Sequence, residues 1–204
     1  MMRNSLKNAQ DGFTLVELMI AMTVFSLVLV AASAGLIQVG RTYYKGVITS
    51  RTQDTSRSII DEISRSVQFS GESPDLVRDG SGNLAAMCLG NTRYSIRTDV
   101  QVGDTNPHGL YKDDAGATCA SADLTTPQTG GVELLGSNMR FSEFDVEALG
   151  DQQYRIVVWV VYGDDDLLEV DPNNADRTIC RGSAVGGQFC ALGELSTVVT
   201  RRLL

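Results

Sequence analysis

The chain has 204 residues, of which 43% are hydrophobic and 21% charged, a balance typical of a folded protein rather than a disordered one. Its net charge of -8 argues against a surface built to neutralise nucleic-acid phosphates. The sequence has a single histidine, His108, which argues against metal sites built from several histidines. A Ser-His-Asp enzyme would depend on this one residue. Since P-loop, G-x-S-x-G and H-E-x-x-H motifs are also missing from the sequence, we expect no enzymatic activity.

Residues 13–37 form a long apolar segment with one charge, Glu17, in 25 positions. A bilayer core needs about 20 apolar residues in a helix, so this segment is long enough to span it. Arg3 and Lys7 precede the segment and place positive charge on the side expected to stay cytoplasmic. The remainder of the chain is then expected to be exported. An acid inside such a span is costly, which predicts a specific role for Glu17.

Two simpler interpretations of this segment stay open. A secretory signal peptide has a shorter apolar core followed by a small-residue cleavage site, which residues 31–34, AASA, could imitate. A plain membrane anchor that is never processed is the other alternative. The junction before the apolar segment distinguishes these interpretations.

That junction reads Gly12-Phe13-Thr14-Leu15-Val16-Glu17. It resembles the type IV pilins and the pilin-like proteins of type II secretion and competence systems. The resemblance is carried by a short basic leader ending in glycine, an aromatic residue, a Thr-Leu-x-Glu continuation and a long apolar helix. It covers roughly residues 7–37.

The resemblance implies a role for three residues of the junction. Gly12 would be the last leader residue, recognised by a prepilin peptidase, and Phe13 would become an N-methylated N-terminus. Glu17 would pair with the N-terminal amine of a neighbouring subunit, which offsets the cost of a carboxylate in hydrocarbon. The alternative for Glu17 is an interfacial residue that reaches to the lipid headgroups.

The resemblance also implies partners and a location. The partners are other pilin or pseudopilin subunits, the prepilin peptidase, an inner-membrane assembly platform and the lipid bilayer. The protein would be a single-pass inner-membrane protein with its head outside the cytoplasm, and later part of a pilus or pseudopilus. The expected organisation is a leader at 1–12, a membrane and filament-core helix at 13–37, an amphipathic stem at 38–69 and a β-rich head at 70–204.

The stem is predicted to continue the helix to about Phe69, because Ser70, Gly71 and Pro74 are signals that end a helix. Polar residues 49–58 interrupt its apolar stripe, which predicts a solvated stretch or a contact with neighbouring subunits. Charged residues near the end of the stem resemble the stem-to-head transition of the larger minor pilins and of the J-type minor pseudopilin; they are Arg57, Asp61, Glu62 and Arg65.

The head is predicted to contain strands at residues 94–102, 139–146, 154–162 and 195–204. The apolar run YRIVVWVVY at 154–162 indicates a central strand buried on both faces. The expected fold class is α+β, with the N-terminal helix packed on an antiparallel sheet.

Four cysteines without C-x-x-C spacing, in a head expected to be exported, favour disulfides over metal binding. Three pairings are possible, and we expect Cys180 with Cys190 and Cys88 with Cys119, because Cys180 and Cys190 bracket a glycine-rich loop. Buried free thiols are the alternative.

An acid-rich stretch at residues 164–176 offers oxygen ligands for calcium. Its spacing does not match an EF-hand loop and such stretches are usually solvated, so we expect no cofactor. The calcium candidates are Asp164, Asp166, Asp171 and Asp176. Residues 99–204 hold seventeen acids against seven bases, a charge that opposes direct DNA binding by the head.

The function predicted from the sequence is that of a minor pilin, a structural subunit that enters a type IV pilus in an assembly-priming or tip complex. A minor pseudopilin of a secretion or competence system is the alternative in the same class. An unprocessed, membrane-anchored binding protein is the alternative in another class.

Overall fold

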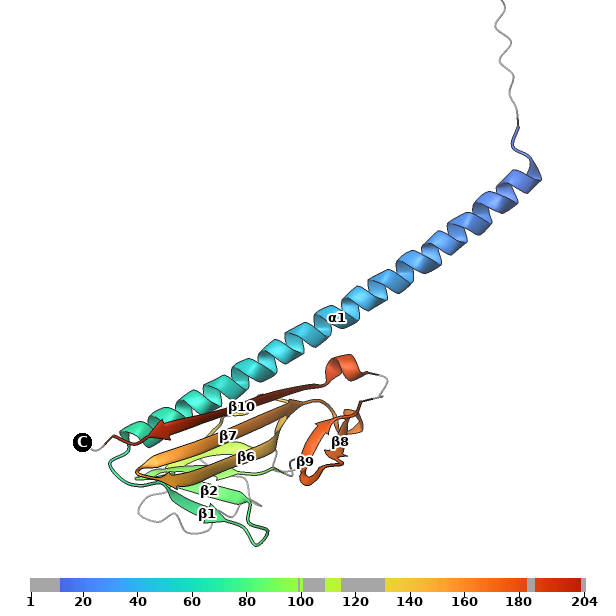
Figure 1. Cartoon of the computed structure of the whole chain (residues 1–204). Helices are drawn as coiled ribbons and strands as arrows, with labels where there is room; N and C mark the ends of the chain where they lie inside the picture. The colour runs from blue at the N-terminus through green and yellow to red at the C-terminus, as the bar shows by residue number, and fades with distance from the viewer. Residues whose placement is uncertain (1–11, 99, 101–108, 115–130, 183–185, 203–204) are drawn as a thin grey trace, which may run out of the picture. The chain divides into compact units, whose positions relative to one another are not determined.

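The computed structural model describes residues 12–98, 100, 109–114, 131–182 and 186–202. The chain divides into two compact units, residues 1–42 and 43–204, which are described separately. The first unit contains the N-terminal part of a long helix. The second contains the rest of that helix and a β-rich head (Figure 1). The expected α+β class, with a helix packed on antiparallel sheets, is confirmed.

The helix α1 spans Leu15–Phe69. Its end agrees with the prediction: the Ser70 N–H donates to the Ser66 carbonyl at 3.0 Å, and the Ser70 hydroxyl donates to the Glu72 carbonyl at 2.7 Å. The first bond closes the last turn of the helix, the second holds the chain just beyond it, and Pro74 prevents its continuation.

The stem part of α1 buries a single stripe of side chains spaced by three or four residues. The stripe consists of Ile48, Thr52, Ser56, Ile59, Ile63 and Val67. Thr52 and Ser56 are fully buried, so the prediction that residues 49–58 are solvated or face neighbouring subunits is wrong at these two positions. Their hydroxyls donate to the carbonyls of Ile48 and Thr52, both at 2.9 Å, which satisfies them inside the packed face.

The head contains three antiparallel sheets. Strands β1 (Asp75–Arg78), β2 (Leu84–Leu89), β3 (Thr92–Ile96), β4 (Leu110–Asp114) and β5 (Val132–Glu133) form the first, in chain order. Strands β6 (Met139–Gly150), β7 (Gln153–Tyr162) and β10 (Ala191–Thr200) form the second, with β7 in the middle. Strands β8 (Leu168–Asp171) and β9 (Asn174–Cys180) form a hairpin.

One hydrophobic core joins the helix and the two larger sheets. Ile59, Ile63 and Val67 of α1 meet alternate side chains of the strands in this cluster. The largest fully buried contributions from the sheets are Met87, Tyr94, Leu110, Phe141 and Ile156. Burying each such side chain contributes roughly 1.5–3 kcal/mol, and this burial is what fixes the stem to the head.

The predicted strands are present, with shifted bounds. Strand β3 is shorter than the expected 94–102, because it ends at Ile96. Strand β10 begins at Ala191, four residues before the expected 195, and β6 continues past 146 to Gly150. Four further strands of the first sheet were not predicted. Strands β1, β4 and β5 are short and polar or lie near glycines, and β2 is apolar at every position, so none of them alternates clearly in the sequence.

Strand β7 is central, but it is buried on both faces only near its end, at Val160 and Val161, and not along its whole length as predicted. Tyr154, Ile156, Val158 and Val160 point into the core, whereas Val157 and Trp159 on the other face are only partly buried. The guanidinium of Arg177 lies 4.0 Å from the centre of the Trp159 ring. A cation above an indole covers this face at Trp159. Further along the same face, Val161 is fully buried in a second apolar cluster with Leu167, Leu168 and Cys190.

Strand β10 approaches the helix closely at Gly193. A Cβ atom there would lie 2.9 Å from the Ser56 hydroxyl and 3.2 Å from both the Thr52 methyl and its backbone carbonyl. We therefore expect Gly193→Ala to lower the free energy of unfolding by about 1–3 kcal/mol. Denaturant unfolding of the full chain in detergent measures this, with Gly182→Ala, where a Cβ meets nothing within 4 Å, as the control. Equal stability of the two variants would contradict this packing.

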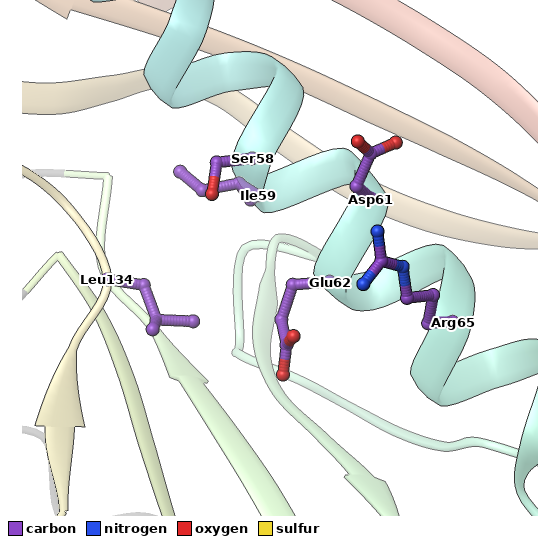
Figure 2. Close-up of a pocket in the computed structure, with 6 residues that line it drawn as sticks. All are labelled: Ser58, Ile59, Asp61, Glu62, Arg65 and Leu134. Atoms are coloured by element: carbon purple, nitrogen blue, oxygen red, sulfur yellow. The ribbon is translucent and has the colours of Figure 1, made fainter.

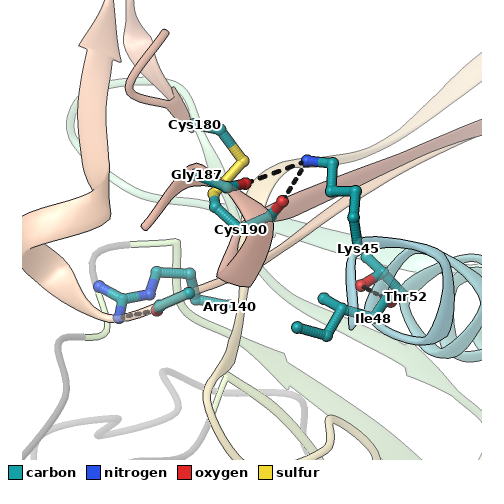
Figure 3. Close-up of a disulfide and its surroundings, with 8 residues drawn as sticks. Lys45, Ile48, Thr52, Arg140, Cys180, Gly187 and Cys190 are labelled. Atoms are coloured by element: carbon teal, nitrogen blue, oxygen red, sulfur yellow. Dashed lines mark hydrogen bonds between the residues drawn. A yellow bond between two sulfur atoms is a disulfide. The ribbon is translucent and has the colours of Figure 1, made fainter. Parts of the chain in front are cut away.

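A disulfide joins Cys180, at the end of β9, to Cys190, immediately before β10 (Figure 3). The predicted pairing is present. The ammonium group of Lys45 on α1 donates to the backbone carbonyls of Gly187 and Cys190. The same loop therefore receives a covalent link from β9 and hydrogen bonds from the stem.

The double variant Cys180→Ala/Cys190→Ala should lose about 2–4 kcal/mol of stability, because the disulfide restricts the unfolded chain over a ten-residue separation. Denaturant unfolding of oxidised wild-type and variant chains gives the difference. When both are fully reduced, the difference should vanish. A persistent gap under reducing conditions would mean that the alanines, not the missing bond, cause the loss.

Candidate functional site

The junction that precedes the apolar segment is held by a reciprocal pair of hydrogen bonds. The Thr14 N–H donates to Glu17 Oε2 at 2.9 Å, and the Glu17 N–H donates to Thr14 Oγ1 at 3.2 Å. The Thr14 hydroxyl also donates to Glu17 Oε2 at 2.8 Å. This is a capping box, which satisfies backbone donors at the start of α1.

Thr14 belongs to the junction quoted in the sequence analysis, but it was assigned no role there. Its spacing of three residues from Glu17 is a recognisable helix-start signal, and could have been identified. Glu17 therefore has a local partner within its own chain, so its presence in the apolar segment has a structural reason as well as the role that the resemblance implies. Gly12 and Phe13 are exposed and precede the helix, so the peptide bond between them is accessible.

The helix α1 is the one helix in the described part of the chain that is long and apolar enough to cross a membrane. Every residue from Gly12 to Val39 is exposed, including its large apolar side chains. The hydroxyls of Thr23, Ser26 and Ser33 each donate to the carbonyl four residues earlier at 2.8 Å. This bonding removes the cost of placing hydroxyls in hydrocarbon.

The charged end of the stem forms a small pocket with Leu134 of the head (Figure 2). Its volume is about 240 Å³, and Ser58, Asp61, Glu62 and Arg65 line it from α1. Glu62 does not stay free in solvent, since its Oε1 accepts hydrogen bonds from Lys112 Nζ at 2.5 Å and from the Tyr94 hydroxyl at 3.2 Å. Ser66 bonds to the same tyrosine hydroxyl at 2.7 Å.

The hydrogen bond from Lys112 holds the pKa of Glu62 below its ordinary value of 4.5. Because the pKa is lowered in the folded chain, the ion pair contributes its full stability above the ordinary pKa of 4.5. This stability is lost as the pH falls through the lower pKa of the folded chain. We expect Glu62→Gln to flatten the acid limb of the stability curve by less than about 1 kcal/mol, since both side chains are more than a third exposed. Thermal unfolding from pH 6 to about pH 3 tests this. An unchanged acid limb would contradict the assigned pairing.

The acid-rich stretch is partly used in contacts with other residues. Asp164 Oδ1 accepts from Asn138 Nδ2 at 3.2 Å, Asp171 Oδ1 accepts from the Asn173 N–H at 2.8 Å, and Asp166 is exposed. The side chain of Asp176 is outside what the structure describes. Over the described ranges, no three histidine, cysteine or acidic side chains form a group that could hold a metal ion.

Cys88 is disulfide-bonded. Two other residues from the sequence analysis, Cys119, which is its expected partner, and His108, lie outside the described residues.

Comparisons with known proteins bear on the N-terminal junction. Neither the curated proteins nor the solved structures gave a match to this chain. Residues 7–33 match a family model described as the prokaryotic N-terminal methylation motif. The matched range contains Gly12, Phe13, the capping box and most of the apolar segment. The chain therefore carries a type IV pilin-like N-terminal methylation signal.

Proposed function

We propose that the chain is a minor pilin, a structural subunit that is processed between Gly12 and Phe13 and then incorporated into a type IV pilus. The observation that carries the proposal is the methylation motif at residues 7–33, placed at the start of a single long apolar helix that leads into a folded head. The role is structural rather than enzymatic.

The proposed sequence of events follows from the charges and the junction. Arg3 and Lys7 keep the leader in the cytoplasm, and the prepilin peptidase removes residues 1–12 there. Phe13 is then N-methylated, and the new chain waits in the inner membrane as a single-pass protein. The disulfide between Cys180 and Cys190 supports a head outside the cytoplasm, because such bonds persist in oxidising compartments.

Assembly would place Glu17 beside the Phe13 amine of a neighbouring subunit. In the low dielectric of a packed filament core, an opposite charge offsets much of the cost of the buried carboxylate. The partners in this scheme are other pilin subunits and the inner-membrane assembly platform. The acidic head is not assigned a role in direct DNA binding.

The first experiment identifies the mature N-terminus. Mass spectrometry of the protein purified from its native membrane should find a chain that begins with N-methylated Phe13. The protein should then be found at low copy in pili sheared from the cell surface. A chain retaining residues 1–12 would instead support an unprocessed membrane anchor, and a processed chain that co-purifies with secretion components but never with pili would support a pseudopilin.

A further inference from the structure

A second pocket lies in the head, far along the chain from the methylation motif. It forms where the edge strand β6 meets the β1–β2 turn and strand β9, and its volume is about 220 Å³. That is below the roughly 300–1,000 Å³ of pockets for drug-sized ligands, so it suits one small ring. Ser142, which lines the pocket, is only 1% exposed to solvent. The side chains of Arg78 and Asp145 are 39% and 35% exposed, so the pocket opens to the surface on their side.

An irregularity in β6 shapes the pocket. The register of β6 against β7 shifts between Phe141 and Glu143, and Ser142 is the extra residue. Phe141 and Phe144 both point into the core as a result. The bulge therefore breaks the alternation of β6 at the pocket wall. Bulges of this kind re-aim side chains and are frequent beside binding sites.

Unsatisfied polar atoms are concentrated in this pocket. Of the seven buried side-chain polar atoms without a hydrogen-bond partner in the described part of the chain, four belong to residues that line it. They are Ser142 Oγ, Glu143 Oε2, Asp145 Oδ1 and Arg177 Nε. The two carboxylate oxygens lie in ion pairs with arginines, whereas Ser142 Oγ and Arg177 Nε have no polar partner. Leaving buried polar atoms without a partner is costly, so these two point to a polar ligand at the pocket wall.

The charged groups are held in place before any ligand arrives. Asp145 Oδ1 lies 2.8 Å from Arg78 Nη2, and Glu143 Oε2 lies 2.5 Å from Arg177 Nη2, in ion pairs not aligned for hydrogen bonding. Arg78 also donates to the Gly82 carbonyl at 2.9 Å. Arg177 rests on the Trp159 ring. These fixed groups lower the cost of ordering the site on binding.

The charge balance selects the class of ligand. The two arginines are each opposed by a carboxylate, so an anion such as phosphate meets repulsion from Glu143 and Asp145. The same pairing leaves the carboxylates neutralised, so a cation meets the guanidinium groups. A hydroxyl suits the pocket, because it donates to a carboxylate oxygen and accepts from a guanidinium or a serine at the same time.

We propose that this pocket binds a neutral sugar ring. Neighbouring hydroxyls of the ring bridge the carboxylates of Glu143 and Asp145 and the donors on Arg177 and Ser142. The exposed rim at Arg78 leaves one side of the ring in solvent, where a glycosidic link can continue. The proposal does not depend on pilus assembly, because binding is measured on the isolated chain.

The test uses the purified full chain in a zwitterionic detergent, because alkyl-glycoside detergents would compete for the pocket. Saturation-transfer NMR with glucose, galactose, mannose and N-acetylglucosamine, each as free sugar and as methyl glycoside, should detect at least one of them. If the methyl glycoside binds, the natural ligand is a sugar ring at the end of a glycan. If only the free sugar binds, the natural ligand is a soluble monosaccharide.

Two variants assign the binding to the pocket. Ser142→Ala should weaken the dissociation constant of the bound sugar about fivefold, and Glu143→Gln about tenfold or more. The matched controls are Ser95→Ala, another buried serine without a hydrogen-bond partner, and Glu147→Gln, on the same strand and paired with Arg155 at 3.3 Å. Neither control residue lines the pocket, and both variants should bind as the wild type does.

Three results would overturn the proposal. The first is no saturation transfer to any sugar of the panel by a chain with a cooperative thermal transition. The second is sugar binding that Ser142→Ala and Glu143→Gln leave unchanged. The third is displacement of the sugar by millimolar phosphate or calcium, which would assign the pocket to an ion.

Discussion

Gly12→Leu should abolish processing and leave a full-length, membrane-bound precursor. A Cβ at Gly12 meets nothing within 4 Å in this chain, so we do not expect the effect to come from a clash at the junction. The obstruction would arise in the peptidase, whose site must admit the backbone between the leader and the helix, where a glycine leaves most room.

Intact-mass measurement of the membrane fraction distinguishes the precursor from the mature chain by the twelve leader residues. Gly35→Leu is the control, because it makes the same change at an exposed glycine of α1 outside the junction, and it should be cut normally. Mature protein at the wild-type level from Gly12→Leu would contradict the assigned cleavage position.

Glu17→Ala should be cleaved and inserted into the membrane but depleted in sheared pili by about tenfold or more, because it removes one partner of a buried charge pair. The capping box offers a second explanation of the same loss, since alanine also removes the acceptor for the Thr14 N–H. Loss of a cap costs about 1 kcal/mol and would weaken the start of the helix.

Glu17→Gln separates the two explanations. Glutamine keeps the acceptor that a capping box requires but carries no charge. If pairing with a neighbouring amine drives assembly, Glu17→Gln should be depleted from pili as strongly as Glu17→Ala. Quantitative immunoblots of pili and membranes give the ratio. Wild-type incorporation of the glutamine variant would remove the proposed pairing and leave Glu17 with its role at the helix start.

Local signals in the sequence were sufficient for the long helix. Ser70, Gly71 and Pro74 mark the end of α1 at Phe69, and the strong alternation of residues 139–146 marks β6. Strand β10 was predicted four residues late, because Gly193 looks like part of a turn when its close approach to the helix is unknown. The sequence also does not show that the hydroxyls of Thr52 and Ser56 bond to backbone carbonyls inside the packed face. These two polar residues were therefore predicted to be exposed.

The sequence indicated the cleavage junction, but it gave no sign of the pocket in the head. The position of Ser142 depends on how β6 pairs with β7, and Arg177 comes from a hairpin that the sequence analysis did not predict. Sites of this kind form from several strands at once, so no motif of fixed spacing reports them. The methylation motif is different, because it is a continuous segment of the sequence.

The loop between Gly187 and Cys190 has a consequence for when the head matures. Its carbonyls receive Lys45 of the stem, and its Cys190 is bonded to Cys180. Thiol pairs stay reduced in the cytoplasm, so under the proposed export of the head this disulfide would form only after the loop has crossed the membrane. Until then no covalent bond would join the start of β10 to β9, and the Lys45 hydrogen bonds would hold the loop to the stem. Closure of the disulfide would thus be the last step in the maturation of the head.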